Sequence, residues 1–485
     1  MLPTTDRFKK GAKETLADPV IQMSMEAVYN GFHTKRQSAG ADTEGWEDQR
    51  DRGRAIKEHT IENLDYYLEM LTDNVDANGG NVFFANDSAA ATEYILNLAS
   101  DRDVKTVIKS KSMVSEEMSL AHEMEAVGIE AVETDLGEYI IQLAGEAPYH
   151  IIAPAIHKSQ DQVAEMFKQT TGIDPGDTPE ELTTTARGML RETFQRADMS
   201  VTGVNFAVAE SGSIVLVTNE GNGRMCTSIP RVHVAVMGME KIVPSMQDLG
   251  VMLRILIRSA TGQRISSYVT MVNGPRRDEE EDGPEEFHLV IVDNGRMKLL
   301  ADEKLREALY CLRCGACLNA CPVYRKVGGH SYGWVYPGPI GAVVSPVLSG
   351  LKQASDLPFA SSLCGACREV CPVRIDIPNM LLHLRQQVVE GPPEVRSVGR
   401  MERLGWKAWR FGNIKSGRFR RGGKLANRLG RPFARGGMFK RLPPPLSGWT
   451  RSRDMPLPAA SPFRDRFKKR LAQSSQDSQS SEGES

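Results

Sequence analysis

Residues 311–322 read Cys311-Leu-Arg-Cys314-Gly-Ala-Cys317-Leu-Asn-Ala-Cys321-Pro322. This spacing, C-x2-C-x2-C-x3-C-P, is that of bacterial ferredoxins, in which three thiolates bind one iron–sulfur cluster and the fourth binds a second cluster. The short gaps let three thiolates converge on one cubane, and the small residues between them let backbone amides approach its sulfides. The stretch therefore predicts a ferredoxin-like, cluster-binding module.

A second run repeats this pattern as Ser361-Ser-Leu-Cys364-Gly-Ala-Cys367-Arg-Glu-Val-Cys371-Pro372, with serine at the position of the leading cysteine. In two-cluster ferredoxins the fourth ligand of each run serves the other cluster. The predicted ligands are Cys311, Cys314, Cys317 and Cys371 for the first cluster, and Cys321, Cys364 and Cys367 for the second. The sequence thus predicts two clusters of the [4Fe–4S] type, the second with only three cysteine ligands.

The remaining iron of the second cluster has several candidate ligands. It could take Ser361, a water, Cys226 or a residue of a partner, or it could be missing, which would leave a three-iron cluster. Zinc is the competing interpretation, but zinc sites usually use two C-x2-C pairs rather than this longer run. Seven of the eight cysteines lie between residues 311 and 371, and without a secretion signal this crowding favours metal ligation over disulfides.

The composition is that of a globular protein of two to four domains. The chain has 485 residues, of which 40% are hydrophobic and 25% charged; a domain usually takes about 100–200 residues. No apolar run approaches the roughly 18–20 residues of a transmembrane helix, and the start, MLPTTDRFKK, lacks the apolar segment of a signal peptide. We therefore do not expect a polytopic membrane protein, a secreted disulfide scaffold or a collagen-like chain.

Short apolar runs alternate with helical patterns after a helix that begins near Ile61. The expected strands are 82–85, 104–108, 129–132 and 150–155, and the expected helices are 89–99, 113–127 and 160–169. This alternation predicts a parallel sheet of βαβ units. Beyond residue 200, strand-like runs at 204–209, 213–218, 232–237, 267–272 and 287–292 lie closer together, with turn residues at Ser211-Gly212 and Asn222-Gly223.

These patterns predict five segments. They are a helical arm (1–60), an α/β domain (61–295), a mainly α-helical dicluster domain with helices at 298–310 and 378–390 (296–390), a basic segment (391–471) and a disordered tail (472–485). From Gly391 onward there are 22 Lys/Arg against 7 Asp/Glu, although the whole chain carries a net charge of −2. An acidic body therefore carries a basic C-terminal segment.

Polar residues follow several of the expected strands, where parallel sheets keep their ligand sites. The candidates are Lys109, Lys111, Asp135, Glu138, His157 and Lys158. The lysines could neutralise a carboxylate or phosphate, although solvated lysines are the favoured interpretation. The acids could instead complement a helix dipole, and His157 could be a base, an anion ligand or a helix cap. Asn222-Gly-Arg224 could form an anion-binding nest or a plain hairpin turn.

Several blocks resemble the lactate utilization iron–sulfur protein B family. Beside the cysteine runs, they are Lys-Ser-Lys-Ser-Met at 109–113, Glu-Thr-Asp-Leu-Gly-Glu-Tyr-Ile-Ile-Gln-Leu at 133–143, Ala-Pro-Ala-Ile-His-Lys at 153–158, Asn-Glu-Gly-Asn-Gly-Arg at 219–224 and Leu-Ser-Gly-Trp-Thr-Arg at 446–451. The resemblance spans residues 6 to 470. It implies an α/β domain with a fold similar to ribose-5-phosphate isomerases and CoA transferases, followed by the two-cluster module.

The resemblance also implies a function. The chain would be an iron–sulfur electron-transfer subunit of a cytoplasmic complex that oxidises L-lactate to pyruvate with companion lactate-utilization proteins. The family's second motif likewise has three cysteines, and Cys226 does not match a family ligand. The alternative is an enzyme with acyl, CoA or small-anion chemistry in the α/β domain and clusters of structural or regulatory role. Glu210 is its strongest hint, because CoA transferases of similar fold use a glutamate nucleophile.

The basic C-terminal segment indicates a charged partner. Its Trp and Phe residues are interspersed with Lys and Arg, so it could contact anionic lipid at a membrane surface or an acidic protein. Docking to the companion subunits is the favoured interpretation, because electron transfer needs close approach. Nucleic acid is not expected, since no recognised binding module accompanies the charge.

Overall fold

The computed structural model describes residues 3–172, 174–444 and 446–481. The chain forms two compact units, Met1–Ser397 and Val398–Ser485. None of the helices in the described ranges combines the length and apolar character needed to cross a bilayer.

A six-stranded parallel sheet forms the centre of the α/β region and confirms the predicted parallel architecture. Its strands, in spatial order, are β1 (Asn81–Ala85), β10 (Glu286–Val292), β7 (Val232–Gly238), β4 (Met199–Gly203), β2 (Thr106–Lys109) and β3 (Glu130–Glu133). Every residue of β2 and β7 is buried. Such continuous burial is expected where helices or a second layer cover both faces of a parallel sheet.

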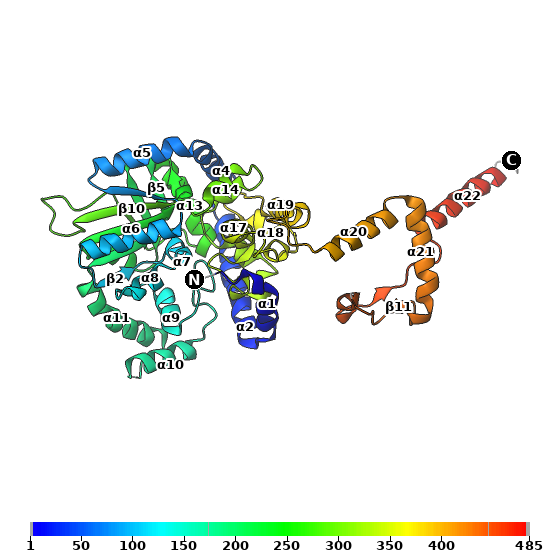
Figure 1. Cartoon of the computed structure of the whole chain (residues 1–485), viewed down its shortest axis with the longest axis horizontal. Helices are drawn as coiled ribbons and strands as arrows, with labels where there is room; N and C mark the ends of the chain where they lie inside the picture. The colour runs from blue at the N-terminus through cyan, green and yellow to red at the C-terminus, as the bar shows by residue number, and fades with distance from the viewer. Residues whose placement is uncertain (1–2, 173, 445, 482–485) are drawn as a thin grey trace. The chain divides into compact units, whose positions relative to one another are not determined.

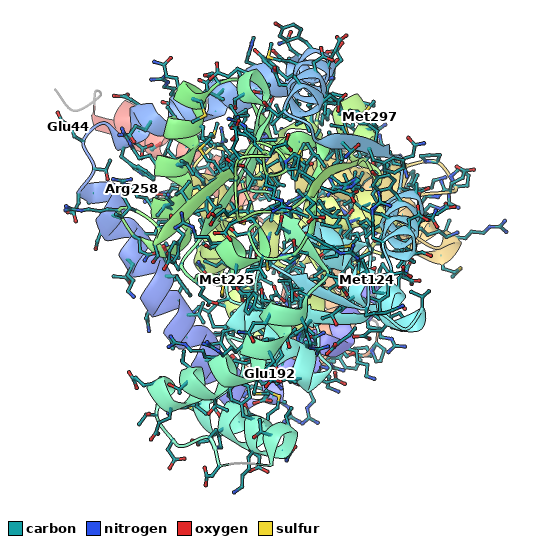
Figure 2. The ribbon with its side chains drawn as sticks, turned by 90° about the vertical axis from the view of Figure 1, so that its left-hand side faces the viewer. Glu44, Met124, Glu192, Met225, Arg258 and Met297 are labelled. Carbon is teal, nitrogen blue, oxygen red and sulfur yellow. The ribbon has the colours of Figure 1, made fainter. Side chains whose placement is uncertain are left out.

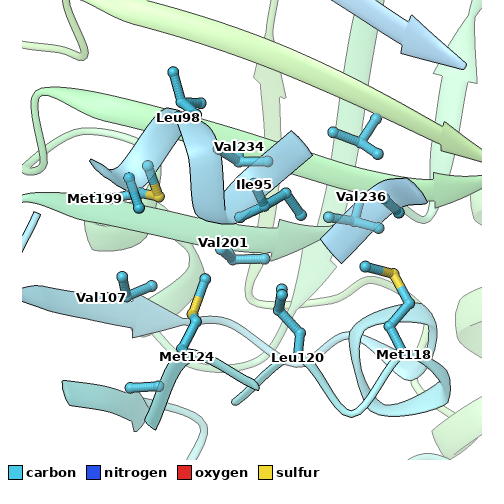
Figure 3. Close-up of a cluster of buried hydrophobic side chains, with 14 of the residues drawn as sticks. Ile95, Leu98, Val107, Met118, Leu120, Met124, Met199, Val201, Val234 and Val236 are labelled. Atoms are coloured by element: carbon cyan, nitrogen blue, oxygen red, sulfur yellow. The ribbon is translucent and has the colours of Figure 1, made fainter. Parts of the chain in front are cut away.

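One face of this sheet packs against α6 (Ser88–Asp101), α7 (Met113–Glu117) and α8 (Leu120–Ala126), as Figure 1 shows for α6 and α8. Ile95 of α6 and Met124 of α8 meet Val201 and Val234 of the sheet in one hydrophobic cluster (Figure 3). Asp87 fixes the start of α6, since its side chain accepts the N–H of Ala90. This core holds the carboxyl ends of the strands in place.

On the other face of the sheet, β3, β2 and β4 are covered by α9 (Leu136–Ala144), α11 (Pro179–Arg196) and α12 (Asn222–Cys226), respectively. A further helix, α10 (Gln160–Thr171), packs on α9 and α11. Capping boxes at Ser159 and Thr178 begin α10 and α11.

A second sheet follows, in the order β8 (Ile242–Val243), β5 (Phe206–Val208), β6 (Ser213–Thr218) and β9 (Tyr268–Val272). β5 and β6 are antiparallel, and the turn at Ser211-Gly212 joins them as expected, with Gly212 at φ 65°. α13 (Met246–Thr261) packs against β5 and β8, and α5 (Leu64–Ala77) against β8.

The cysteine runs lie in a mainly helical region that includes α14 (Arg296–Ala301), α15 (Ala316–Ala320), α17 (Gly338–Ser349), α18 (Ala366–Val370) and α19 (Ile377–Glu390). N-terminal helices pack on it: α1 (Phe8–Ala17) and α2 (Pro19–Val28) contact α16 (Tyr324–Val327). α3 (Thr34–Ala41) and α4 (Trp46–Glu62) pack on α13. Arg258 of α13, labelled near Glu44 in Figure 2, donates from Nε to Thr43 Oγ1 at 3.0 Å. The helical arm thus joins both regions.

Several expected elements differ from the structure. Residues 150–155 form bends and turns instead of a strand, because the His150 ring is buried against α15 and bonded to Asn319. The expected helix 113–127 is interrupted at Ser119, which has φ 56°, and the expected helix 298–310 breaks after Ala301. The expected strand 204–209 is shorter, since β4 and β5 belong to different sheets. Asn222-Gly223 begins α12 rather than a hairpin turn.

The second unit contains α20 (Arg400–Asn413), α21 (Ser416–Gly430), α22 (Phe463–Ser481) and a two-stranded ribbon of β11 (Met438–Phe439) and β12 (Met455–Pro456). Its exposed apolar side chains include Trp406, Trp409 and Phe419. The tail expected to be disordered, 472–485, begins within α22, and its last residues, 482–485, lie outside the described residues.

Candidate cluster site and the adjoining cavity

The two cysteine runs have the same backbone geometry. In the first, Arg313 and Gly315 have φ of 60° and 73° before the short helix α15. In the second, Leu363 and Gly365 have φ of 55° and 87° before α18. Gly315 and Gly365 adopt this left-handed backbone without the cost that it has for residues with a Cβ, whereas Arg313 and Leu363 bear that cost. α15 and α18 pack against each other, so the two runs face one another.

The seven motif cysteines gather into two neighbouring groups of free thiols. The pKa of Cys317 is raised well above its usual value, first by burial and then by Cys311, Cys314, Cys367 and Cys371. Burial, Cys321 and Cys364 raise the pKa of Cys367 to about 12. Beside burial, Cys371 also raises the pKa of Cys314, and Cys364 raises the pKa of Cys321. These interactions link Cys371 to the first run and Cys321 to the second. This crossed arrangement of thiols fits the donor set of two iron–sulfur clusters.

Backbone N–H groups point at the sulfur atoms, as they do around iron–sulfur clusters. The N–H of Arg313 donates to Cys311 Sγ at 3.4 Å, and the N–H of Tyr324 donates to Cys321 Sγ at 3.5 Å. In the second run the N–H of Leu363 donates to Ser361 Oγ at 3.1 Å. The Ser361 oxygen therefore has the same local position as the Cys311 sulfur.

Hydrogen bonds from Arg385 also fix the backbone at Ser361. Arg385 donates from Nη2 to the Ser361 carbonyl at 2.9 Å and from Nε to the Pro358 carbonyl at 2.8 Å. Ser361 and Cys226 are the two side chains of this chain that could be the remaining ligand of the second cluster, and Ser361 lies in the second cysteine run. Cys226 does not: it is fully buried with Ile108 and Phe194 in the α/β core, 3.5 Å from Thr134 Oγ1.

Buried cations lie around the first group of cysteines, and no sequence pattern predicts them. Arg36 donates to the Val370 carbonyl at 2.6 Å, and Arg50 donates to the Cys371 carbonyl at 2.8 Å. Lys57 and Lys241 act electrostatically on Cys311, although burial lowers the pKa of Lys57 to about 7 and of Lys241 to about 8. Positive charge of this kind stabilises the reduced, more negative state of an iron–sulfur cluster.

A buried ion network connects the cluster loop to the parallel sheet. Arg296 binds Glu117 through two N–H groups, each at 3.0 Å, and donates from Nε to Glu240 at 2.9 Å. Glu240 lies 3.6 Å from Arg313, and Tyr336 donates to Glu117 at 2.7 Å. The side chains of Arg296, Glu117 and Glu240 are at most 2% exposed. The network fixes Arg313 between Cys311 and Cys314 relative to β7.

A cavity of about 330 Å³ lies between the carboxyl edge of the sheet and the first cysteine run. Lys111, Asp135 and Asn222 line its sheet side, and Arg313 and Cys314 line the other side. Three sequence-predicted residues from different strand ends thus meet here. Asp135 also caps α9, because its carboxylate accepts the N–H groups of Gly137 and Glu138.

Lys109 and Glu138 lie buried near this cavity. The Lys109 ammonium is 1% exposed and pairs with Glu116 at 2.9 Å and with Glu133, so the expectation of a solvated lysine is wrong. Glu138 Oε1 lies 3.7 Å from Lys111 Nζ. The lysine nitrogen is itself covered and has no hydrogen-bond partner among the described residues, so a solvated Lys111 is also wrong.

The other candidates lie elsewhere. His157 and Lys158 both bind the Glu146 carboxylate. His157 Nε2 lies 2.7 Å from Glu146 Oε2, within hydrogen-bond distance, and Lys158 pairs with the other oxygen. Glu146, His157 and His330 form a group that could hold a metal ion, but Lys158 already neutralises the carboxylate. Glu210 accepts the N–H of Met246 at 2.6 Å and so caps α13, while Arg224 is exposed on α12.

Glu138 makes the stability of the chain depend on pH. Burial and the nearby Glu133 raise its pKa from 4.5 to about 8, against the opposing effect of Lys111. The folded chain therefore holds a proton that the unfolded chain releases, and stability falls as pH rises from about 4.5 to 8. The slope is up to about 1.4 kcal/mol per pH unit.

We expect Glu138→Gln to remove this part of the slope, measured by denaturant unfolding across that pH range. Glu192→Gln, at an exposed position of α11 (Figure 2), is the matched control and should leave the slope unchanged. Equal slopes for the wild type and Glu138→Gln would show that Glu138 titrates as an ordinary carboxyl group.

Comparison with known proteins gives a consistent match along the chain. Residues 68–292 match the family model described as LUD domain, 307–375 the 4Fe-4S dicluster domain, and 385–472 lactate utilisation protein B, C-terminal. The chain is 48% identical over 469 residues to lactate utilization protein B of Macrococcus caseolyticus, covering 96% of this chain and 98% of that protein. It is 45% identical over 471 residues to the protein of the same name from Shouchella clausii, covering 97% and 98%.

Among solved structures, a DUF162 family protein from Deinococcus radiodurans aligns with a TM-score of 0.27 and 13% identity. The alignment covers 47% of this chain and 98% of that protein. This similarity is too weak to support an argument about fold.

Proposed function

Because this chain belongs to the lactate utilization protein B family, we propose that it is the iron–sulfur electron-transfer subunit of a cytoplasmic complex that oxidises L-lactate to pyruvate. The observation that carries the proposal is that the two cysteine runs face one another through α15 and α18, with Cys371 acting on Cys314 and Cys364 acting on Cys321. Removal of two electrons from lactate suits a chain with two one-electron centres.

The residues that would hold the centres are those predicted from spacing. The first cluster would take Cys311, Cys314, Cys317 and Cys371, and the second would take Cys321, Cys364, Cys367 and the oxygen of Ser361. Bound there, the clusters would supply one-electron transfer. In the first group Cys314 and Cys371 are buried and the other two cysteines are half-buried, whereas the second group contains the exposed Cys364. An exposed second group supports electron exchange with another protein at that surface.

The companion lactate-utilization proteins would bind partly through the second unit. Its helices α20 and α21 carry exposed Trp406, Trp409 and Phe419 among basic side chains. Aromatic residues and arginine favour protein interfaces, and their positive charge suits an acidic partner. The α/β region would share the fold of ribose-5-phosphate isomerases and CoA transferases, which its parallel sheet supports. Glu210 caps α13, so it does not support the alternative acyl-transfer chemistry.

The proposal is tested by lactate-dependent reduction. The full chain with loaded clusters, mixed anaerobically with its companion proteins and L-lactate, should show bleaching of its visible absorbance and formation of pyruvate. D-lactate is the stereochemical control. Clusters that dithionite reduces but that stay oxidised with L-lactate and all companions would contradict the proposal.

Substitution of Ser361 tests the ligand of the second cluster. If its oxygen binds iron, Ser361→Ala should lose iron on brief air exposure faster than the wild type and give a three-iron EPR signal. Ser361→Cys should resist this loss, because it completes a fourth thiolate. Equal iron retention by the wild type and both variants would indicate that water or a partner provides the remaining ligand.

A further inference from the structure

We propose that the cavity between the parallel sheet and the first cysteine run binds a small carboxylate with an oxygen on its second carbon, such as L-lactate or pyruvate. The choice of carboxylate rests on the proposed function. The existence and polarity of the site rest on the cavity itself.

The cavity occupies the position in the sheet where ligands are expected. Its wall includes residues that follow β2, β3 and β4 at their carboxyl ends, among them Lys111, Asp135 and Asn205. Strands β2 and β4 are neighbours in the sheet. The chain leaves β2 for β3, at one edge of the sheet, and after β4 it returns to the sheet at β7, on the opposite side of this pair. Loops that leave adjacent strands in opposite directions open a crevice between them, and parallel sheets bind ligands there. The volume of about 330 Å³ suits a small molecule.

Polar atoms without partners lie along this wall. Lys111 Nζ and Arg313 Nη1 are both covered, and neither makes a hydrogen bond to any described residue. Asn222 is 6% exposed, and its side-chain oxygen likewise has no partner in the part of the chain that the structure describes. Buried polar groups are normally paired, because an unpaired one loses its interaction with water without compensation. A carboxylate would accept hydrogen bonds from the two cations. An adjacent hydroxyl would donate to Asn222 Oδ1, whereas a keto oxygen would accept from the Asn222 side-chain NH2 group.

The acidic side chains of the cavity are already engaged. Glu240 is held by Arg296 at 2.9 Å, and Asp135 caps α9. Glu220 accepts the N–H of Leu136 at 3.3 Å, and burial raises its pKa. Lys241, next to Glu240, adds a further cation to the wall. Lys111 and Arg313 each face a carboxylate, Glu138 at 3.7 Å and Glu240 at 3.6 Å, but both distances lie beyond hydrogen-bond range. An anion in the cavity could therefore still accept hydrogen bonds from Lys111 Nζ and Arg313 Nη1.

The site adjoins the electron-transfer centre. Cys314, a predicted ligand of the first cluster, lines the cavity directly, and Arg313 lies beside it. Arg313 also stacks over the Tyr336 ring at 4.5 Å, which fixes its guanidinium at the wall. A carboxylate bound to Lys111 and Arg313 would therefore lie against the loop that carries the first cluster.

Calorimetric titration of the full, cluster-loaded chain tests the inference with L-lactate, pyruvate, propionate and inorganic phosphate. L-lactate or pyruvate should bind, and Lys111→Met should weaken that binding by about ten-fold or more, since a charged hydrogen bond is lost. Asn222→Ala should weaken binding of L-lactate and pyruvate but not of propionate, which lacks the second oxygen. Arg224→Met, on the exposed side of α12, is the matched control and should bind as the wild type does.

Iron content and thermal unfolding of each variant identify any that has simply failed to fold, and a shift in the EPR spectrum of the reduced first cluster on ligand addition gives a second readout. Absence of binding by either carboxylate to a chain with reducible clusters would overturn the inference and leave the proposed function intact. Phosphate binding as tightly as lactate, and insensitive to Asn222→Ala, would overturn the carboxylate assignment. A chain that binds pyruvate but holds no reducible cluster would instead overturn the proposed function alone.

Discussion

Cys371→Ala is expected to remove the same cluster as Cys314→Ala, although the two cysteines belong to different runs. Both lie in the first group of thiols, and Arg36 acts electrostatically on both. In the same way, Cys321→Ala should match Cys364→Ala. Each variant should lose up to about four of about eight iron atoms per chain, and the EPR signal that disappears should be common to each pair. Alanine is preferred to serine because a serine oxygen can remain a ligand.

Cys226→Ala is the matched control for these four variants. Its thiol is fully buried in the α/β core next to Thr134, so the variant should keep the full iron content and both EPR signals. If Cys371→Ala resembled Cys364→Ala instead, each run would bind its own cluster, and the crossed ligand assignment would be wrong.

Arg296→Met is expected to cost about 3–5 kcal/mol of unfolding free energy. The substitution keeps much of the apolar volume but leaves Glu117 and Glu240 without the cation that binds both of them. Tyr336 and Asn294 still donate to Glu117, and Arg313 still faces Glu240, so the loss should fall within that range rather than abolish folding at low temperature. Chemical denaturation of the full chain, with iron content recorded in parallel, measures the effect.

Arg196→Met is the control for burial. Arg196 pairs with Glu130 where both side chains are about half exposed, and such surface pairs contribute about 0–1 kcal/mol. Similar losses for Arg196→Met and Arg296→Met would contradict the role given to the buried network.

The cluster module was the most predictable part of the chain, for a physical reason. Cluster ligation restricts the spacing of cysteines within a short segment, so each cysteine run can be recognised from local sequence, whereas the crossed ligand assignment rests on the ferredoxin pattern. The parallel sheet was similarly accessible, because strands such as β2 and β7 are continuously apolar and alternate with helices. Ser361 could be identified as a candidate ligand from its place in the repeat, although its bond from the Leu363 N–H could not.

Interactions between distant segments could not be predicted. Residues 150–155 are as apolar as a strand, yet the contact of His150 with Asn319 places them in a loop. Lys109 has the sequence context of a solvated lysine, and only the fold brings Glu116 and Glu133 to it. Arg36 and Arg50 lie in helices far along the chain from the Val370 and Cys371 carbonyls that they bind. A charged residue gives no local signal of such a partner.

We infer that this chain carries two iron–sulfur clusters that accept electrons. The most direct test is the iron and acid-labile sulfide content of anaerobically purified protein, with low-temperature EPR before and after addition of dithionite. We expect about eight irons and about eight sulfides per chain, with two interacting signals of reduced [4Fe–4S] clusters. Stoichiometric zinc with negligible iron, and no EPR signal on reduction, would show that the cysteine runs bind zinc instead of iron–sulfur clusters.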